Sequence, residues 1–190
     1  MITAAVIAAA VCLVFLYAEK RSYHSYKVLN TSEQEGVVST QYVDMDGDIL
    51  RYSPDGVSVV DNSMNTIWNE TYTMQNPIAD VNGSRAVVAD SEGTSLYICD
   101  KKGVTGTVTT SYAIVKVRIA SNGMVAVILD NDDNTWINFY NPDGSLVAEN
   151  LTKIDDPGYP MDVAVSDNGV MMVTFQYVDG LSLIHISEPT

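Results

Sequence analysis

A unit of about 40 residues recurs along this chain, and it is clearest between Ile114 and Ile154. It contains four short runs rich in Val, Ile, Tyr and Trp, each bounded by Asn, Asp, Gly or Pro. This composition is typical of β-strands joined by tight turns. The Asn-Gly turns at Gly83, Gly123 and Gly169 lie 40 and 46 residues apart. Four-stranded units at this spacing predict β-propeller blades, and an antiparallel sandwich is the alternative.

Strand patterns inside the unit support this interpretation. Apolar and other residues alternate from Val115 to Ala120, so one face of that strand should be buried. Met124–Leu129 is continuously apolar, as expected for a strand covered on both faces. The sequence therefore predicts an all-β partial β-propeller of about three and a half four-stranded blades. The expected blades are residues 41–74, 75–113, 114–155 and an incomplete 156–180.

An apolar run, Ile2–Ala18, precedes the repeats and is interrupted only by Thr3. As a helix its 17 residues would reach about 25 Å, slightly less than a bilayer core of about 30 Å. No small-x-small cleavage pattern directly follows it, so we expect one uncleaved transmembrane helix. A signal peptide and a buried soluble helix are the alternatives. We expect residues 1–26 to form the helix and juxtamembrane segment, and 27–40 a linker.

Local charge gives conflicting information on orientation. Lys20, Arg21 and Lys27 follow the apolar run, and nothing basic precedes it. Basic residues collect on the cytoplasmic side of membrane helices. Taken alone, this asymmetry favours a cytoplasmic location for the repeats.

Composition excludes several kinds of site. The formal net charge of -14 argues against binding to nucleic-acid phosphates. Cys12 lies in the apolar run and Cys99 in a predicted strand, so we expect neither a disulfide nor a cysteine metal site. The only histidines, His24 and His185, lie outside the repeats. A Ser-His-Asp triad and histidine metal ligands are therefore absent from the repeats, and we expect no cofactor.

Two acidic stretches invite comparison with metal sites. Asp44–Asp48 has carboxylates at alternating positions, as part of a calcium loop would. Asp55 stands where such a loop needs a bidentate Glu. Asp130–Asn134 is a second oxygen-rich stretch. We interpret both as acidic turns and assign no metal ligand.

One face of the predicted propeller gathers negative charge. In a blade, the loop between the second and third strands and the connection to the next blade lie on the same face. The acidic residues in these segments are Asp55, Asp90, Glu92, Asp130, Asp132, Asp133, Asp155 and Asp156. Clustered like charges focus the local field, so this face should bind a cationic partner or, weakly, divalent cations. The alternative is that these turns serve only solubility.

An enzymatic role is the less favoured alternative. Asp155 and Asp156 could act as acid and base in a hydrolase or lyase of cell-surface polysaccharide. Adjacent side chains on an extended chain point apart, so the pair is poorly placed for that chemistry. We assign no catalytic residue.

The chain resembles a bacterial family of uncharacterised membrane-anchored, propeller-like proteins over about Ile2–Gly180. Besides the apolar run, the matching motifs are Tyr26-Lys27-Val28-Leu29, Gln41-Tyr42, Met74-Gln75-Asn76-Pro77-Ile78 and Gly158-Tyr159-Pro160. The resemblance implies a single-pass protein of the cell membrane with its propeller outside the cytoplasm. We expect it to bind or scaffold a protein or cell-envelope partner at the cell surface. Members carry a basic segment before the helix, which this chain lacks, and continue past Gly180, so we expect a fragment.

The last ten residues, Leu181–Thr190, resemble a translated sequencing adapter. We therefore expect them to be non-native. The alternative is a genuine third strand of the last unit, because Asp179-Gly180 is a favourable turn and several of the following residues are apolar.

Overall fold

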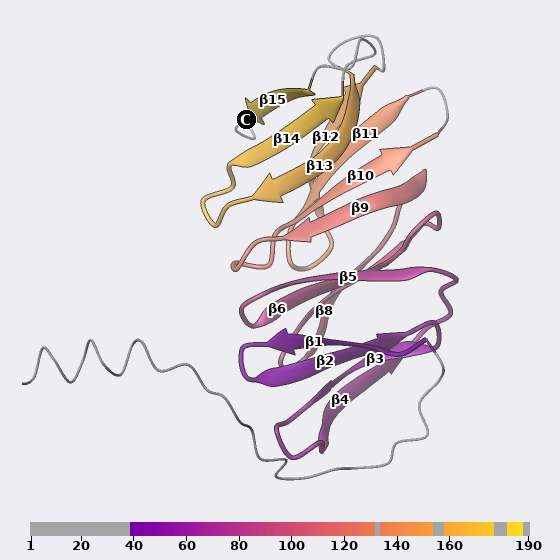
Figure 1. Cartoon of the computed structure of the whole chain (residues 1–190), viewed down its shortest axis with the longest axis vertical. Coiled ribbons are helices and arrows are strands. Elements are labelled where there is room, and N and C mark those ends of the chain that lie inside the picture. Colours follow the sequence, from indigo (N-terminus) through magenta and orange to yellow (C-terminus); the bar gives the residue numbers. More distant parts are fainter. Residues whose placement is uncertain (1–38, 132–133, 154–157, 177–181, 188–190) are drawn as a thin grey trace, which may run out of the picture. The chain divides into compact units, whose positions relative to one another are not determined.

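The structure is a computed structural model that describes residues 39–131, 134–153 and 158–176, together with the backbone of 182–187. Every regular element in this part of the chain is a β-strand (Figure 1). The all-β prediction is therefore confirmed. The predicted helix over Ile2–Ala18 lies outside the described residues. Within the described ranges, no helix has the length and hydrophobicity needed to cross a membrane.

The strands form four antiparallel sheets in chain order. Sheet 1 contains β1 (Gln41–Met45), β2 (Asp48–Ser53), β3 (Gly56–Val60) and β4 (Thr66–Thr71). Sheet 2 contains β5 (Pro77–Asn82), β6 (Arg85–Asp90), β7 (Ser95–Asp100) and β8 (Gly103–Thr109). Sheet 3 contains β9 (Ala113–Ile119), β10 (Val125–Asp130), β11 (Thr135–Tyr140) and β12 (Leu146–Thr152). Sheet 4 contains β13 (Tyr159–Val165), β14 (Met171–Gln176) and β15 (Ser182–Ser187).

Successive sheets meet through their first strands. β1 contacts β5, β5 contacts β9, and β9 contacts β13, while the outer strands β4 and β8 also touch. Figure 1 shows the sheets following one another along the β region, each turned relative to the last. Consecutive four-stranded meanders that stack face to face through their first strands have the arrangement of propeller blades. The fold is therefore propeller-like.

Strand β6 shows why the repeats must stack. Ala86 and Val88 pack against sheet 1, whereas Val87 and Ala89 pack against sheet 3. All four side chains are fully buried. Because alternate residues of a strand point to opposite faces, a strand between two sheets must be apolar at every position. The continuous apolar stretch predicted at Met124–Leu129 does the same in β10, where Val125–Leu129 is buried.

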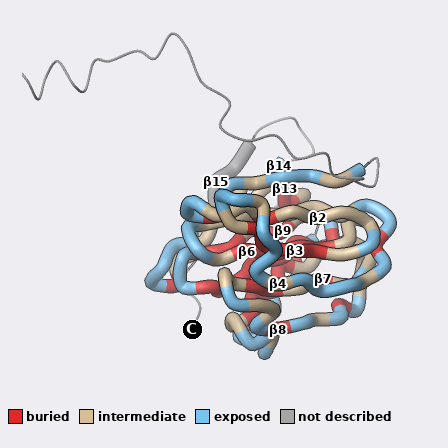
Figure 2. The backbone as a smooth tube through the Cα atoms, turned by 90° about the horizontal axis from the view of Figure 1, so that it is seen from below, coloured by how far each residue is buried: buried red, intermediate tan, exposed pale blue. Residues whose placement is uncertain are grey.

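One apolar core fills each of the three spaces between sheets. Sheets 3 and 4 meet through Ile128 and Phe139 on one side and Val163, Val173 and Phe175 on the other. Burying each such side chain contributes about 1.5–3 kcal/mol to folding. Figure 2 shows the buried stretches in the interior, and exposed backbone along the turns and outer strands. The sheets are thus held mainly by shared apolar faces.

Strand β15 pairs antiparallel with β14, with Ser182 opposite Gln176 and Ser187 opposite Met171. This backbone arrangement corresponds to the third strand that the sequence offered as an alternative to a non-native end. Its side chains are outside the described residues. The non-native origin of Leu181–Thr190 stays a prediction.

Candidate binding face

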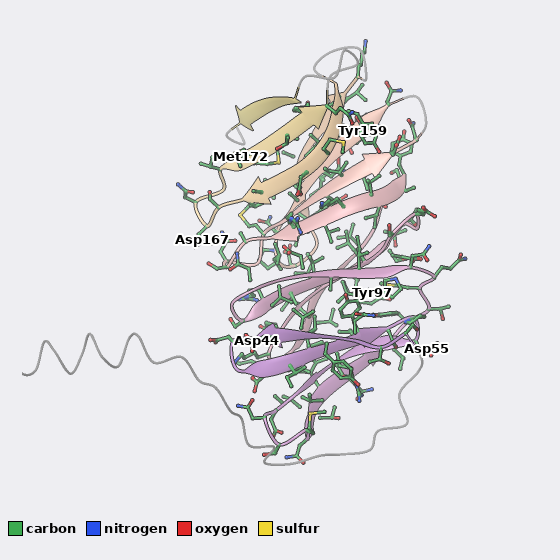
Figure 3. All side chains as sticks on the ribbon, in the orientation of Figure 1. Asp44, Asp55, Tyr97, Tyr159, Asp167 and Met172 are labelled. Carbon is green, nitrogen blue, oxygen red and sulfur yellow. The ribbon has the colours of Figure 1, made fainter. Side chains whose placement is uncertain are left out.

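The turns of the sheets divide between two faces. We call the upper face the side with the turns after the second strands and the connections between sheets, and the lower face the side with the remaining turns. Figure 3 shows Asp55 and Tyr159 at one side of the β region, and Asp44 and Asp167 at the other. Of the predicted acidic residues, the described ones, Asp55, Asp90, Glu92 and Asp130, belong to the upper face.

Asp90 is the last residue of β6 and has a structural role on the upper face. Its Oδ1 atom accepts hydrogen bonds from the backbone N–H of Gln75 at 2.9 Å and of Asn76 at 2.8 Å. The N–H of Ser91 donates to the carbonyl of Asn76 at 2.9 Å. A Cβ at Gly93 would lie only 2.4 Å from the Asp90 carboxylate, so glycine leaves the room that this carboxylate occupies. Asp90 therefore fixes the connection from sheet 1 to sheet 2.

Glu92 sits in the turn between β6 and β7 with a positive φ of 66°. Few non-glycine residues adopt this conformation. Its backbone N–H donates to the carbonyl of Ile114 at 2.8 Å, and the N–H of Ile114 donates back to Gly93 at 2.7 Å. The turn of sheet 2 is thus tied to the start of sheet 3. The exposed side chain of Glu92 lines a cleft on this face.

The cleft has a volume of about 400 Å³ and lies where sheets 2, 3 and 4 approach one another. Its lining residues are Ser91, Glu92, Ala113, Ile114, Val115, Asp130 and Tyr159. The hydroxyl of Tyr159 donates to Oδ2 of Asp130 at 2.9 Å. Burial, and then the hydrogen bond to Asp130 and its charge, raise the pKa of Tyr159 to about 12. The phenol therefore stays neutral near pH 7 and remains a hydrogen-bond donor.

Of the other described acidic residues that were predicted, Asp55 and Asp90 do not line this cleft. Asp55 lies on sheet 1 and lines a different cleft. Asp132, Asp133, Asp155 and Asp156 are outside the described residues, so the polysaccharide hydrolase alternative that depends on the last two stays a prediction. Of the predicted set, the structure brings together Glu92 and Asp130.

Sequence reasoning missed Tyr159 and Lys153 as parts of this face. Tyr159 appeared only within a family motif, and its position after the acidic connection was the available signal. Lys153 directly follows β12 and is exposed, so the upper face also carries a cation. Tyr159 and Lys153 are distant in sequence from Asp90 and Glu92. Only the order of the sheets places these four residues on one face.

Some acidic residues elsewhere are paired with bases between sheets. On the lower face, Lys101 Nζ lies 3.1 Å from Asp48 Oδ2 and donates to the carbonyl of Asp46 at 2.6 Å. The hydrogen bond with Asp48 is the largest contribution that raises the pKa of Lys101. Asp46 and Gly47 have positive φ values of 53° and 88°, so Asp44–Asp48 forms a tight hairpin turn rather than a calcium loop.

Arg118 joins the first strands of three sheets. Its guanidinium lies 3.4 Å from Asp80 Oδ1 of β5 and 3.1 Å from Asp162 Oδ2 of β13. Lys116 Nζ also lies 3.3 Å from Asp162 Oδ2. Burial pushes the pKa of Asp162 upward, but the N–H of Val163 and these two bases outweigh it and lower the pKa.

No cluster of three or more His, Cys, Asp or Glu side chains suited to a metal ion occurs in the described part of the chain. The described cleft offers two carboxylates and a phenol that donates to one of them. A sequence comparison assigns its family. A model of a family of unknown function, DUF5711, matches residues 19–184. The chain belongs to this family. The sequence has no significant match among curated proteins.

Solved structures share the fold of this family member. The chain resembles Hsv2 of Kluyvelomyces marxianus, with a TM-score of 0.58 at 19% identity, over 81% of this chain and 48% of that one. It also resembles BamB of Moraxella catarrhalis, with a TM-score of 0.51 at 16% identity, over 80% and 48% of the two chains. These structures support a propeller-like fold. The chain spans about half the length of each of them.

Proposed function

We propose that this member of the DUF5711 family is a membrane-anchored binding or scaffolding module whose upper face takes a cationic partner. Its described sheets are then consecutive blades of a partial propeller outside the cytoplasm. The apolar run Ile2–Ala18 and the resemblance to membrane-anchored proteins support the anchor and its location.

The observation that supports this proposal most directly is the cleft that contains Glu92, Asp130 and Tyr159. Its walls belong to three sheets, and hydrogen bonds between Glu92, Gly93 and Ile114 hold the turn of sheet 2 against sheet 3. A binding surface that is already ordered loses little conformational entropy when a ligand arrives. Two carboxylates and the phenol oxygen offer acceptors to an ammonium or guanidinium group.

The net negative charge of the chain also favours a cationic ligand. The chain carries 24 acidic and 10 basic residues. Its negative field should speed the encounter with a basic peptide and weaken with added salt. Long-range attraction alone would not depend on which acidic residue is removed, whereas binding in the cleft would. This difference defines the experiment.

The test uses the full chain in detergent and a lysine-rich peptide, with calcium as a second probe. A Glu92→Gln/Asp130→Asn variant should bind the peptide at least about tenfold more weakly at low salt, a change of about 1.4 kcal/mol. The matched control is Asp44→Asn/Glu70→Gln, which removes the same charge from two exposed residues of sheet 1. Isothermal titration calorimetry measures both. Equal affinity of the two variants would reject the cleft as the binding site.

A further inference from the structure

Strand β12 is the outer strand of sheet 3, and the strand order leaves its outer edge without a partner strand among the described residues. Such an edge presents backbone N–H and C=O groups with which another extended chain can pair, unless Lys, Pro or a bulge prevents it. β12 has a bulge at Val147, which the register with β11 skips. From Ala148 to Thr152 the pairing is regular, and this stretch contains neither Lys nor Pro. It is therefore open to further pairing.

The outer strands of sheets 1 and 2 are less open than β12. Among large apolar side chains, β4 exposes only Ile67 and β8 exposes none. In β8, Thr105 Oγ1 also donates to the carbonyl of Pro142 at 2.8 Å, so a turn of sheet 3 lies against this strand. The large apolar side chains that β12 exposes are Leu146, Val147 and Leu151, at 52%, 42% and 43%.

Three residues of β12 share the face of sheet 3 that is turned toward sheet 2: Leu146, Glu149 and Leu151. Leu146 pairs with Tyr140 and Leu151 pairs with Trp136, and both aromatic side chains pack into the core that sheets 2 and 3 share. Residues opposite each other in antiparallel strands point to the same face. The row along this edge thus reads apolar, acidic, apolar.

Glu149 is the acidic residue of this row, and a hydrogen bond orients it. Glu149 is exposed, whereas its register partner Asn138 is only 5% exposed and donates from Nδ2 to Glu149 Oε2 at 3.1 Å. Opposite charges on paired strands attract. A strand with a basic residue between two apolar residues at alternate positions therefore matches this edge. The formal net charge of -14 also attracts a basic partner and repels a second copy of this chain.

We propose that β12 takes up an extended basic segment of another protein, which adds to the four strands of sheet 3. In this mode of recognition, backbone hydrogen bonds along the edge supply affinity and alternate side chains supply specificity. The base of the segment lies opposite Glu149, and an apolar residue two positions away lies opposite Leu151. The site uses none of the residues that line the upper-face cleft, so it stands whether or not that cleft binds a cation.

The test uses the full chain in detergent and a synthetic peptide of about nine residues, in which Val, Lys and Val alternate with Thr around the centre. Excess peptide should slow hydrogen exchange in Ala148–Thr152 at least about fivefold, because an added strand protects the amides with which it pairs. A peptide with Glu in place of Lys should bind about tenfold more weakly by calorimetry.

Exchanging the charges identifies the contact. Glu149→Lys should weaken binding of the Lys peptide and strengthen binding of the Glu peptide, because the pair of charges is reversed. Leu151→Lys should weaken binding of the Lys peptide at least about fivefold. Ile67→Lys is the matched control, since it adds the same charge at an exposed apolar residue of β4. Hydrogen exchange in β5–β11 reports whether each variant is folded.

Unchanged exchange of Ala148–Thr152 in excess peptide would overturn the proposal. Loss of binding in Glu92→Gln/Asp130→Asn, with none in Glu149→Lys, would locate the peptide in the upper-face cleft. That result would reject the edge site and leave the proposed function intact. Protection that appears without peptide and disappears on dilution would also reject the proposal, because a second copy would then be pairing with β12.

Discussion

The upper and lower faces treat their acidic residues differently. On the lower face, Lys101 approaches Asp48 and Arg85 lies 3.4 Å from Asp100. On the upper face, Asp90 and Asp130 accept hydrogen bonds from backbone N–H groups and from a phenol. A base neutralises a carboxylate, whereas a neutral donor orients it and leaves its charge. Neutral donors also hold Asp61, Asp143 and Asp167 on the lower face. The two faces therefore differ in the bases beside Asp48 and Asp100 rather than in the use of neutral donors.

The comparison also separates two ways of fixing turns. On the lower side, the Asn141–Ser145 turn of sheet 3 presses directly against Gly106, a residue within β8 of sheet 2. Upper-face turns are joined by hydrogen bonds around a cleft. Hydrogen bonds also join the lower-face turns of sheets 3 and 4, from Ser121 and Asn122 to Asp167. Close backbone contact leaves no space for a ligand. We therefore expect substitutions on the lower face to change stability most, and those on the upper face to change binding.

The largest effect is expected at Gly106. A Cβ there would lie 2.5 Å from backbone atoms of Asp143 and Gly144. Since the obstruction is backbone, Gly106→Ala should lower the free energy of unfolding by about 3 kcal/mol. Gly83→Ala is the control, because its Cβ would meet nothing within 4 Å and the cost is limited to a positive φ, about 1–2 kcal/mol. Chemical denaturation of both variants measures the difference. Equal losses would show that the lower turns are not tightly packed.

An intermediate effect is expected where Arg118 joins three sheets. Arg118→Met keeps the aliphatic stem but leaves Asp80 and Asp162 without this partner, so unfolding should become easier by about 1–3 kcal/mol. The groups are partly exposed, so the lower end of this range is expected. Lys102→Met is the control for removing one exposed cation. Thermal unfolding checks the order of the two variants.

The ion pairs of Arg118 should also affect how the stability of the protein falls in acid. The folded-state pKa of Asp162 is lowered, so its contribution to stability is present above its ordinary value near 3.8 and is lost as pH falls through the lower folded value. Between about pH 5 and 3, the melting temperature of Asp162→Asn should fall less steeply than that of the unaltered chain. Asp44→Asn is the matched substitution on β1. An unchanged acid limb in Asp162→Asn would contradict the lowered pKa.

The smallest effect is expected at Tyr159. Asp130→Asn removes one of the causes that raise the pKa of Tyr159 to about 12, while burial, the largest cause, remains. The pKa should therefore fall only part of the way toward the ordinary value near 10. Carbon NMR of labelled tyrosine follows the titration, and Asp55→Asn serves as the control. A pKa unchanged in Asp130→Asn would show that the hydrogen bond is not formed in solution.

The repeat could be read from sequence because its signals are local. Gly83 and Gly123, which the sequence marked as turns, have the positive φ that glycine adopts readily in turns. The unbroken apolar run in β10 predicted burial on both faces, and Val125–Leu129 is buried. The clefts could not be read in this way. Glu92, Asp130 and Tyr159 meet only because three sheets approach one another, and nothing local distinguishes Asp90, a backbone cap, from Asp130.

The shared faces of β6 constrain how such a chain can change during evolution. Ala86 and Val88 serve one core, and Val87 and Ala89 serve another. Replacing one residue disturbs a single core. Inserting one residue shifts every later side chain of the strand to the opposite face and exchanges the contents of two cores. Length variation among relatives should therefore be confined to turns, and strands such as β6 should vary in composition but not in length.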